Sequence, residues 1–102
     1  MPFLIRVETE TGSAIEEGSD TQNVLTELAD RSPCNEGLAL VSMIDPWGNT
    51  VFNRLQIPIL LRDINNLLSV ANPEEREVLN SVATLAHRAL GEPHLYLKIY
   101  GD

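Results

Sequence analysis

The sequence predicts an α+β domain, in which an antiparallel sheet of three to four strands carries two long C-terminal helices and one short helix, packed mainly on one face. Segments near both ends of the chain alternate between apolar and polar residues, as half-buried strands do. Two segments between them repeat apolar residues at helical spacing. With 102 residues, the chain has the size of one domain with one core, so we expect residues 1–102 to form a single globular domain.

The first third of the chain predicts a strand, a loop and a short helix. Phe3–Glu8 alternates and is expected to be a half-buried strand. Thr11–Ser19 contains two Gly and two Ser, which favour a loop. The short helix follows and extends through Arg31, with either Asp20 or Thr21 as its cap.

The middle of the chain predicts a hairpin. Leu38–Ile44 is apolar on both faces, which is typical of a central strand with cover on each side or of a strand whose second face meets a partner. Asp45–Gly48 has the Pro and Gly of a reverse turn, and Thr50–Phe52 would be the returning strand. Trp47 would stand near the tip of the turn, where it either folds back over the domain or anchors a partner.

Two long helices are expected next. The first begins at Asn53, which has capping-box spacing to Gln56, or nearer Pro58, and its apolar stripe extends to about Val70. The second, Asn72–Gly91, has a capping Asn followed by Pro and two acidic residues, and it ends at Gly before a second Pro.

The chain ends in the alternating segment His94–Tyr100, a predicted strand. Its three aliphatic residues would face the core. The opposite face is either a binding surface, since Tyr is favoured at interfaces, or an ordinary solvent-facing surface. That face would carry His94, Tyr96, Lys98 and Tyr100.

The charge distribution limits the kinds of partner. Seven Lys and Arg against fifteen Asp and Glu give a net charge of −8, which disfavours binding to nucleic acid and to anionic membranes. Between Val7 and Arg31 there are seven acidic residues and no basic one. These acids form either a solvated face or a surface that meets a basic partner.

The residues that commonly carry catalysis or hold metals show no matching pattern. The sequence has no phosphate-binding loop, dinucleotide glycine motif, nucleophile elbow or paired-Cys spacing. His87 and His94 are separated by the predicted end of a helix, which is not metal-ligand spacing within one element. Cys34 lies among turn formers and is expected to be a passive thiol. We therefore expect no enzyme activity, no cofactor and no metal.

A lone cysteine and no signal-peptide pattern predict a cytoplasmic protein.

Two segments carry a resemblance. Asp45–Gln56 (DPWGNTVFNRLQ) and Pro93–Asp102 (PHLYLKIYGD) resemble segments of small, acidic, uncharacterised bacterial proteins. In size, acidity and lack of catalytic motifs the chain is also similar to bacterial immunity proteins, which neutralise a cognate toxin by binding it; that similarity is one of type and involves no shared motif.

These observations predict a non-catalytic, cytosolic protein-binding module, possibly in the form of an immunity-type inhibitor of a basic toxin such as a nuclease. The alternatives are a structural or regulatory subunit that forms a homodimer through its tyrosine-bearing strand face, or a small-molecule binder that uses the predicted hairpin, Asn53 and Arg54 as a polar pocket. The candidate partner-binding residues are Glu8, Glu10, Glu16, Glu17, Asp20, Asp45, Trp47, Asn49, Tyr96 and Tyr100.

Overall fold

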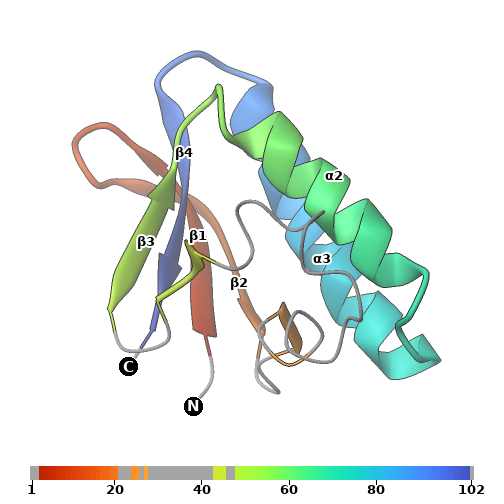
Figure 1. Ribbon diagram of the computed structural model, residues 1–102. Helices are drawn as coiled ribbons and strands as arrows, with labels where there is room; N and C mark the ends of the chain where they lie inside the picture. The colour runs from red at the N-terminus through yellow and green to blue at the C-terminus, as the bar shows by residue number, and fades with distance from the viewer. Residues whose placement is uncertain (1–2, 21–23, 26, 28–42, 46–47, 102) are drawn as a thin grey trace.

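A four-stranded sheet with both long helices on one face makes up the described part of the fold (Figure 1). The computed structural model describes residues 3–20, 24–25, 27, 43–45 and 48–101. Every strand pair is antiparallel and the strand order is β2-β1-β4-β3, so the predicted α+β class is confirmed. The elements are β1 (Phe3–Thr9), β2 (Ala14–Asp20), β3 (Asn49–Phe52), α2 (Ile57–Leu68), α3 (Pro73–Leu90) and β4 (Leu95–Tyr100).

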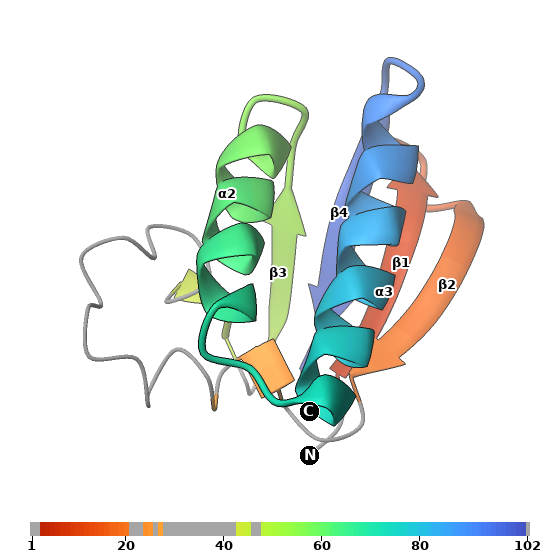
Figure 2. The same ribbon diagram turned by 90° about the vertical axis from the view of Figure 1, so that its right-hand side faces the viewer.

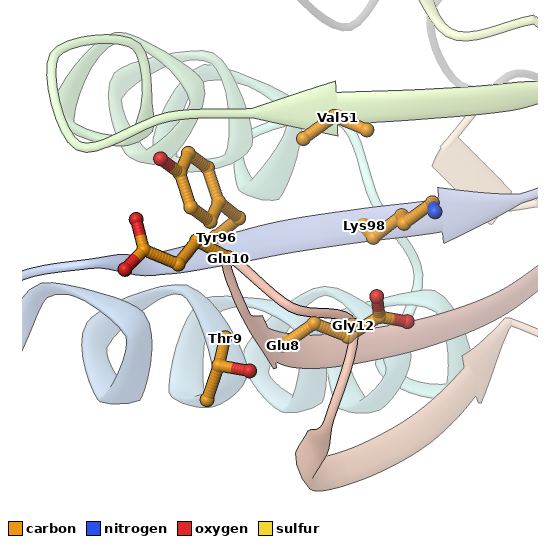
Figure 3. Close-up of a pocket in the computed structure, with 7 residues that line it drawn as sticks. All are labelled: Glu8, Thr9, Glu10, Gly12, Val51, Tyr96 and Lys98. Atoms are coloured by element: carbon orange, nitrogen blue, oxygen red, sulfur yellow. The ribbon is translucent and has the colours of Figure 1, made fainter.

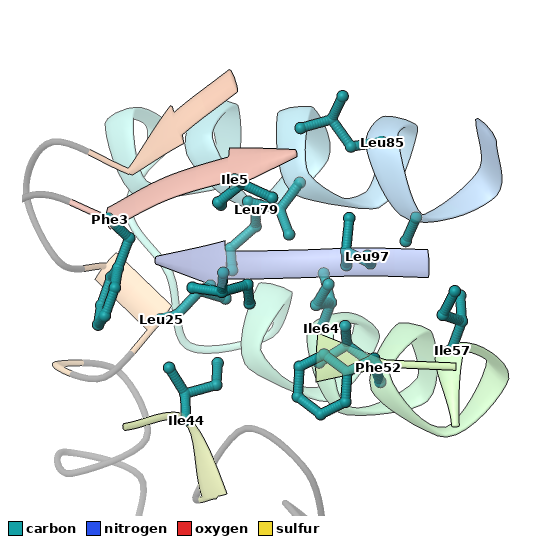
Figure 4. Close-up of a cluster of buried hydrophobic side chains, with 14 of the residues drawn as sticks. Phe3, Ile5, Leu25, Ile44, Phe52, Ile57, Ile64, Leu79, Leu85 and Leu97 are labelled. Carbon is teal, nitrogen blue, oxygen red and sulfur yellow. The ribbon is translucent and has the colours of Figure 1, made fainter. Parts of the chain in front are cut away.

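The core lies between the sheet and the two helices. The helices run antiparallel, α2 beside β3 and α3 over β1 and β4 (Figure 2). Ile5 of β1 and Leu97 of β4 are fully buried, as the alternation of their strands predicts. Figure 4 shows Ile64 of α2 and Leu79 of α3 in the same cluster. No helix among the described residues is long and apolar enough to cross a membrane.

The predicted loop Thr11–Ser19 is wrong, because most of it is strand β2, which pairs along β1. The turn between these strands is only a few residues long: the Thr9 carbonyl accepts from the N–H of Gly12, which has a φ of 90°. Gly, Ser and Glu are uncommon in strands, but pairing to a neighbour outweighs this weak preference. Gly18 also allows α3 to approach, since a Cβ atom there would lie 2.8 Å from Leu85 Cδ1.

The Gly48 N–H donates to the Asp45 carbonyl at 3.4 Å, which agrees with the predicted reverse turn, whose two central residues lie outside the described part of the chain. Gly48 also accepts from the N–H of Gly101, which extends the pairing of β3 with β4. Most of the predicted strand Leu38–Ile44 lies outside the described residues, and so does Trp47. The last two residues of that segment are described and are not in a strand.

The start of α2 combines both sequence alternatives. The Asn53 N–H donates to the Gln56 side chain at 2.9 Å, and the Gln56 N–H donates to Asn53 Oδ1 at 3.0 Å. These reciprocal bonds stabilise a turn, and the helix itself begins at Ile57 with Pro58 in its first turn. Pro is favourable there because the first helical N–H groups have no partner within the helix.

Helix α3 begins with the predicted capping Asn, which forms a capping box with Glu75. Asn72 Oδ1 accepts from the Glu75 N–H at 2.8 Å, and Glu75 Oε1 accepts from the Asn72 N–H at 3.0 Å.

We expect Asn72→Ala to lower the free energy of unfolding by about 1 kcal/mol, because both bonds are perturbed or lost. Urea denaturation measures this loss. Asn80→Ala, on the exposed face of the same helix, is the control and should be neutral or slightly stabilising; equal losses for both variants would contradict the capping role.

Candidate functional site

One face of the sheet carries no helix among the described residues, and we call it the helix-free face (Figure 1). Alternation along the strands directs a second set of side chains to this face. The registers place Arg6 opposite Lys98, Glu8 opposite Tyr96, and Lys98 opposite Val51. The helix-free face therefore combines charged, aromatic and aliphatic side chains from three strands.

Tyr100 organises the charged groups on the helix-free face. Its hydroxyl donates a hydrogen bond to the Glu8 carboxylate. The Arg6 guanidinium carbon lies 5.4 Å from the centre of the Tyr100 ring, and the Lys98 ammonium lies 4.9 Å from it. Arg6 Nε also donates to Glu17 Oε2 at 2.8 Å. These contacts restrain the Tyr100 ring and the Glu8 carboxylate.

A pocket of about 250 Å³ opens on the helix-free face beside the β1–β2 turn, and we call it the acidic pocket (Figure 3). Glu8 is the most deeply placed of its charged groups, with only 4% of the residue exposed. Tyr96 provides an aromatic wall and Val51 an aliphatic one. The lining residues are Glu8, Thr9, Glu10, Gly12, Val51, Tyr96 and Lys98. Two carboxylates and one ammonium group are in this lining, so its acidic groups outnumber its basic ones.

A second pocket, which we call the Arg54 pocket, lies on the other side of Tyr96. Its volume is also about 250 Å³, and it is lined by Asn53, Arg54, Leu55, His94, Leu95 and Tyr96. The two pockets are neighbours, because Tyr96 lines both and Glu10 Oε2 lies 3.9 Å from His94 Nδ1. His94 has a φ of 68°, a left-handed conformation that His tolerates better than most residues.

Three of the sequence-predicted contact residues come together at the acidic pocket: Glu8, Glu10 and Tyr96. Tyr100 lies on the same face and contacts Glu8. Glu17 is also there but is bonded to Arg6. The alternation of the first and last strands predicted the outward direction of Glu8, Tyr96 and Tyr100, whereas Glu10 lies in the β1–β2 turn and Glu17 on β2.

The other predicted contact residues that the structure describes do not line the acidic pocket. Glu16 lies toward α3, where its Oε1 atom is 3.6 Å from Arg88 Nε. Asn49 is on the helix-free face opposite Tyr100, at the first residue of β3, and it does not line the acidic pocket. Asp45 precedes β3, where its N–H donates to the Thr50 hydroxyl at 3.0 Å. Trp47 is outside the described residues. The predicted combination of the N-terminal acids with the Asp45–Asn49 turn is therefore not found at the acidic pocket among the described residues.

Asp20 cannot present its side chain to a partner, because it is fully buried. Its carboxylate oxygens accept from the N–H groups of Val24 at 2.8 Å and Leu25 at 3.0 Å. Val24, Leu25 and Glu27 are helical, so Asp20 stabilises a helical segment. Its bonds reach four and five residues along the chain, whereas the predicted cap would bond two or three residues on. The cause of the misplacement is that Asp20 ends β2 on the core side, opposite Phe3.

Thr9, Gly12 and Val51 also line the acidic pocket and were not predicted as contact residues. Gly12 belongs to the turn that was not recognised, whereas the register that brings Val51 beside Lys98 needs the pairing of β3 with β4. The burial of Asp63 in α2 was not predicted either. Asp63 follows Leu60 by three residues and so lies on the apolar stripe of the helix, which indicates that it faces the core. Within the described ranges, no group of three or more His, Cys, Asp and Glu could hold a metal ion.

Comparison of the chain with models of protein families, with curated proteins and with solved structures gave no match.

Proposed function

We propose that this protein is a non-catalytic protein-binding module that receives a basic partner on the helix-free face of its sheet. The observation that carries the proposal is the acidic pocket, whose lining combines the carboxylates of Glu8 and Glu10 with the side chains of Tyr96 and Val51. A lysine or arginine side chain of the partner would place its charge at the carboxylates and its aliphatic stem against Tyr96 and Val51.

The buried position of Glu8 supports a specific contact. Its carboxylate is held by the Tyr100 hydroxyl, and Arg6 and Lys98 lie against the Tyr100 ring. A fixed carboxylate loses little freedom when a partner binds, so less of the interaction energy is spent on ordering the site. Charged groups that lose solvent on binding also interact more strongly than exposed ones.

The net charge of −8 supports a basic partner over an acidic one, because complementary fields speed association. An immunity-type inhibitor in the cytoplasm, which neutralises a basic toxin such as a nuclease, is the form of this function that we favour. The same charge argues against nucleic acid and anionic membranes as partners.

A second copy of the chain is the alternative occupant of the helix-free face, since Val51 is 48% exposed and Tyr96 lies beside it. Such a homodimer would bring the acidic pockets of two copies onto the same interface, where like charges repel. This repulsion is the reason for preferring a basic partner.

Capture from the native host with the tagged chain tests the proposed function. We expect one basic protein that is retained at low salt and released near 1 M salt, where charges are screened beyond about 3 Å. Once it is identified, calorimetry with the purified protein should show at least tenfold weaker binding to Glu10→Lys, because a carboxylate that meets the partner becomes an ammonium group.

The matched control is Glu77→Lys, which makes the same charge change on exposed α3, on the other side of the sheet. It should weaken binding less than threefold, through the long-range field alone. Equal effects of the two variants would refute the helix-free face as the binding surface. If sedimentation instead shows twice the chain mass and no other protein is captured, the homodimer replaces the proposed function.

A further inference from the structure

We infer that the acidic pocket and the Arg54 pocket form one site for the C-terminal residue of a polypeptide, when that residue is arginine or lysine. The side-chain cation would occupy the acidic pocket, and the terminal carboxylate would meet the Arg54 pocket. This inference deepens the proposed function and rests on it, because it names the part of the basic partner that is recognised.

The Arg54 pocket presents hydrogen-bond donors. Asn53 Oδ1 already accepts from the N–H groups of Leu55 at 2.9 Å and Gln56 at 3.0 Å, which leaves the Asn53 NH₂ group as the donor of that side chain. Within the described part of the chain, no carboxylate lies within ion-pairing distance of the Arg54 guanidinium. A guanidinium beside an amide NH₂ and the imidazole of His94 suits an anion, and a planar carboxylate matches the fork of an arginine.

The closeness of the two pockets selects the ligand. They share Tyr96, and Glu10 of the acidic pocket lies 3.9 Å from His94 of the Arg54 pocket. The cation and the anion of the ligand must therefore be separated by a short distance. One C-terminal basic residue carries both groups, whereas neighbouring residues of an extended chain direct their side chains to opposite sides.

The apolar surroundings favour a polypeptide over a free amino acid. Leu55, at the Arg54 pocket, is 82% exposed, and Val51, at the acidic pocket, is 48% exposed. Exposed aliphatic side chains beside a polar site gain contacts when a longer chain covers them. A free arginine would fill the two pockets and would also carry an α-ammonium group, for which the Arg54 pocket has no carboxylate in its lining.

Calorimetry with short peptides and the intact protein tests the inference. The probe is acetyl-Gly-Gly-Arg with a free carboxylate. Its C-terminal amide lacks the negative charge of the carboxylate, and its citrulline analogue lacks the positive charge of the guanidinium. We expect the amide and the citrulline peptide to bind at least fivefold more weakly than the probe. Free arginine should also bind more weakly.

Substitutions assign the two charges to the two pockets. Arg54→Gln should lower the affinity for the probe to that for its amide, and it should leave the affinity for the amide unchanged. Glu10→Gln should lower the affinity for both peptides. The control Arg62→Gln, on the exposed face of α2, should change neither. Equal binding of the probe and its amide would overturn the inference, as would an equal effect of Arg54→Gln on both. Tighter binding of free arginine than of the probe would also overturn the inference, because the ligand would then be a free amino acid and not the end of a polypeptide.

The peptide result and the protein result can be separated. If Glu10→Lys weakens binding of the captured partner, but the affinity for the peptides does not depend on their terminal carboxylate, the inference fails and the proposed function stands. If Glu10→Lys leaves a captured partner unaffected, the proposed function fails, and the terminal-residue inference fails with it.

Discussion

Asp20→Ala is expected to lower the free energy of unfolding by about 3 kcal/mol. The fully buried carboxylate accepts from the N–H groups of Val24 and Leu25, and alanine would leave both donors without an acceptor. An unsatisfied buried donor costs about 1–3 kcal/mol, so two of them account for a loss of this size. Urea denaturation followed by circular dichroism measures it.

Two variants make the Asp20 result specific. Asp20→Asn keeps one oxygen acceptor and should lose less than alanine does. Glu16→Ala, on the same strand, removes only an exposed ion pair with Arg88 and should change stability by less than about 0.5 kcal/mol. A loss for Asp20→Ala as small as that for Glu16→Ala would show that Asp20 does not stabilise the helical segment.

Tyr96→Ala is expected to weaken binding of the basic partner by about 30-fold, which corresponds to about 2 kcal/mol. The ring is a wall of both pockets, so its loss removes apolar contact on two sides and admits water between the charged groups. Tyr96→Phe keeps the ring and should remain within about threefold of the wild type. Calorimetry with the captured partner gives these affinities.

The control for Tyr96 is Val70→Ala, which removes an exposed aliphatic side chain just after α2 and should not change the affinity. Thermal melts of both variants separate lost binding from lost folding. A folded Tyr96→Ala protein with wild-type affinity would exclude the two pockets from the interface.

The sequence predicted best those elements whose local signals agree with their tertiary environment. The strand Phe3–Glu8 and the last strand alternate, and each buries its apolar residues as expected. The start of α3 has Asn72, Pro73 and Glu75 in their favoured positions, so its capping Asn and its first turn could be predicted. In these segments the order of neighbouring residues in the sequence is enough to indicate the secondary structure and the buried face.

The failures occurred where a partner distant in sequence decides the structure. β2 is a strand because β1 pairs with it, and its Gly, Ser and Glu residues do not indicate this. Asp20 was assigned to a charged surface, although the end of β2 turns it into the core. The two pockets depend on the register of three strands and on two turns, so no single motif in the sequence could show them.

The central claim is that the helix-free face binds the partner, and nuclear magnetic resonance of the ¹⁵N-labelled chain tests it most directly. Titration with the captured basic protein should shift the amide signals of Glu10, Val51, Tyr96 and Lys98, and leave those along the exposed side of α2 and α3 in place. Shifts confined to α2 and α3, with the signals of the helix-free face unchanged, would contradict the account.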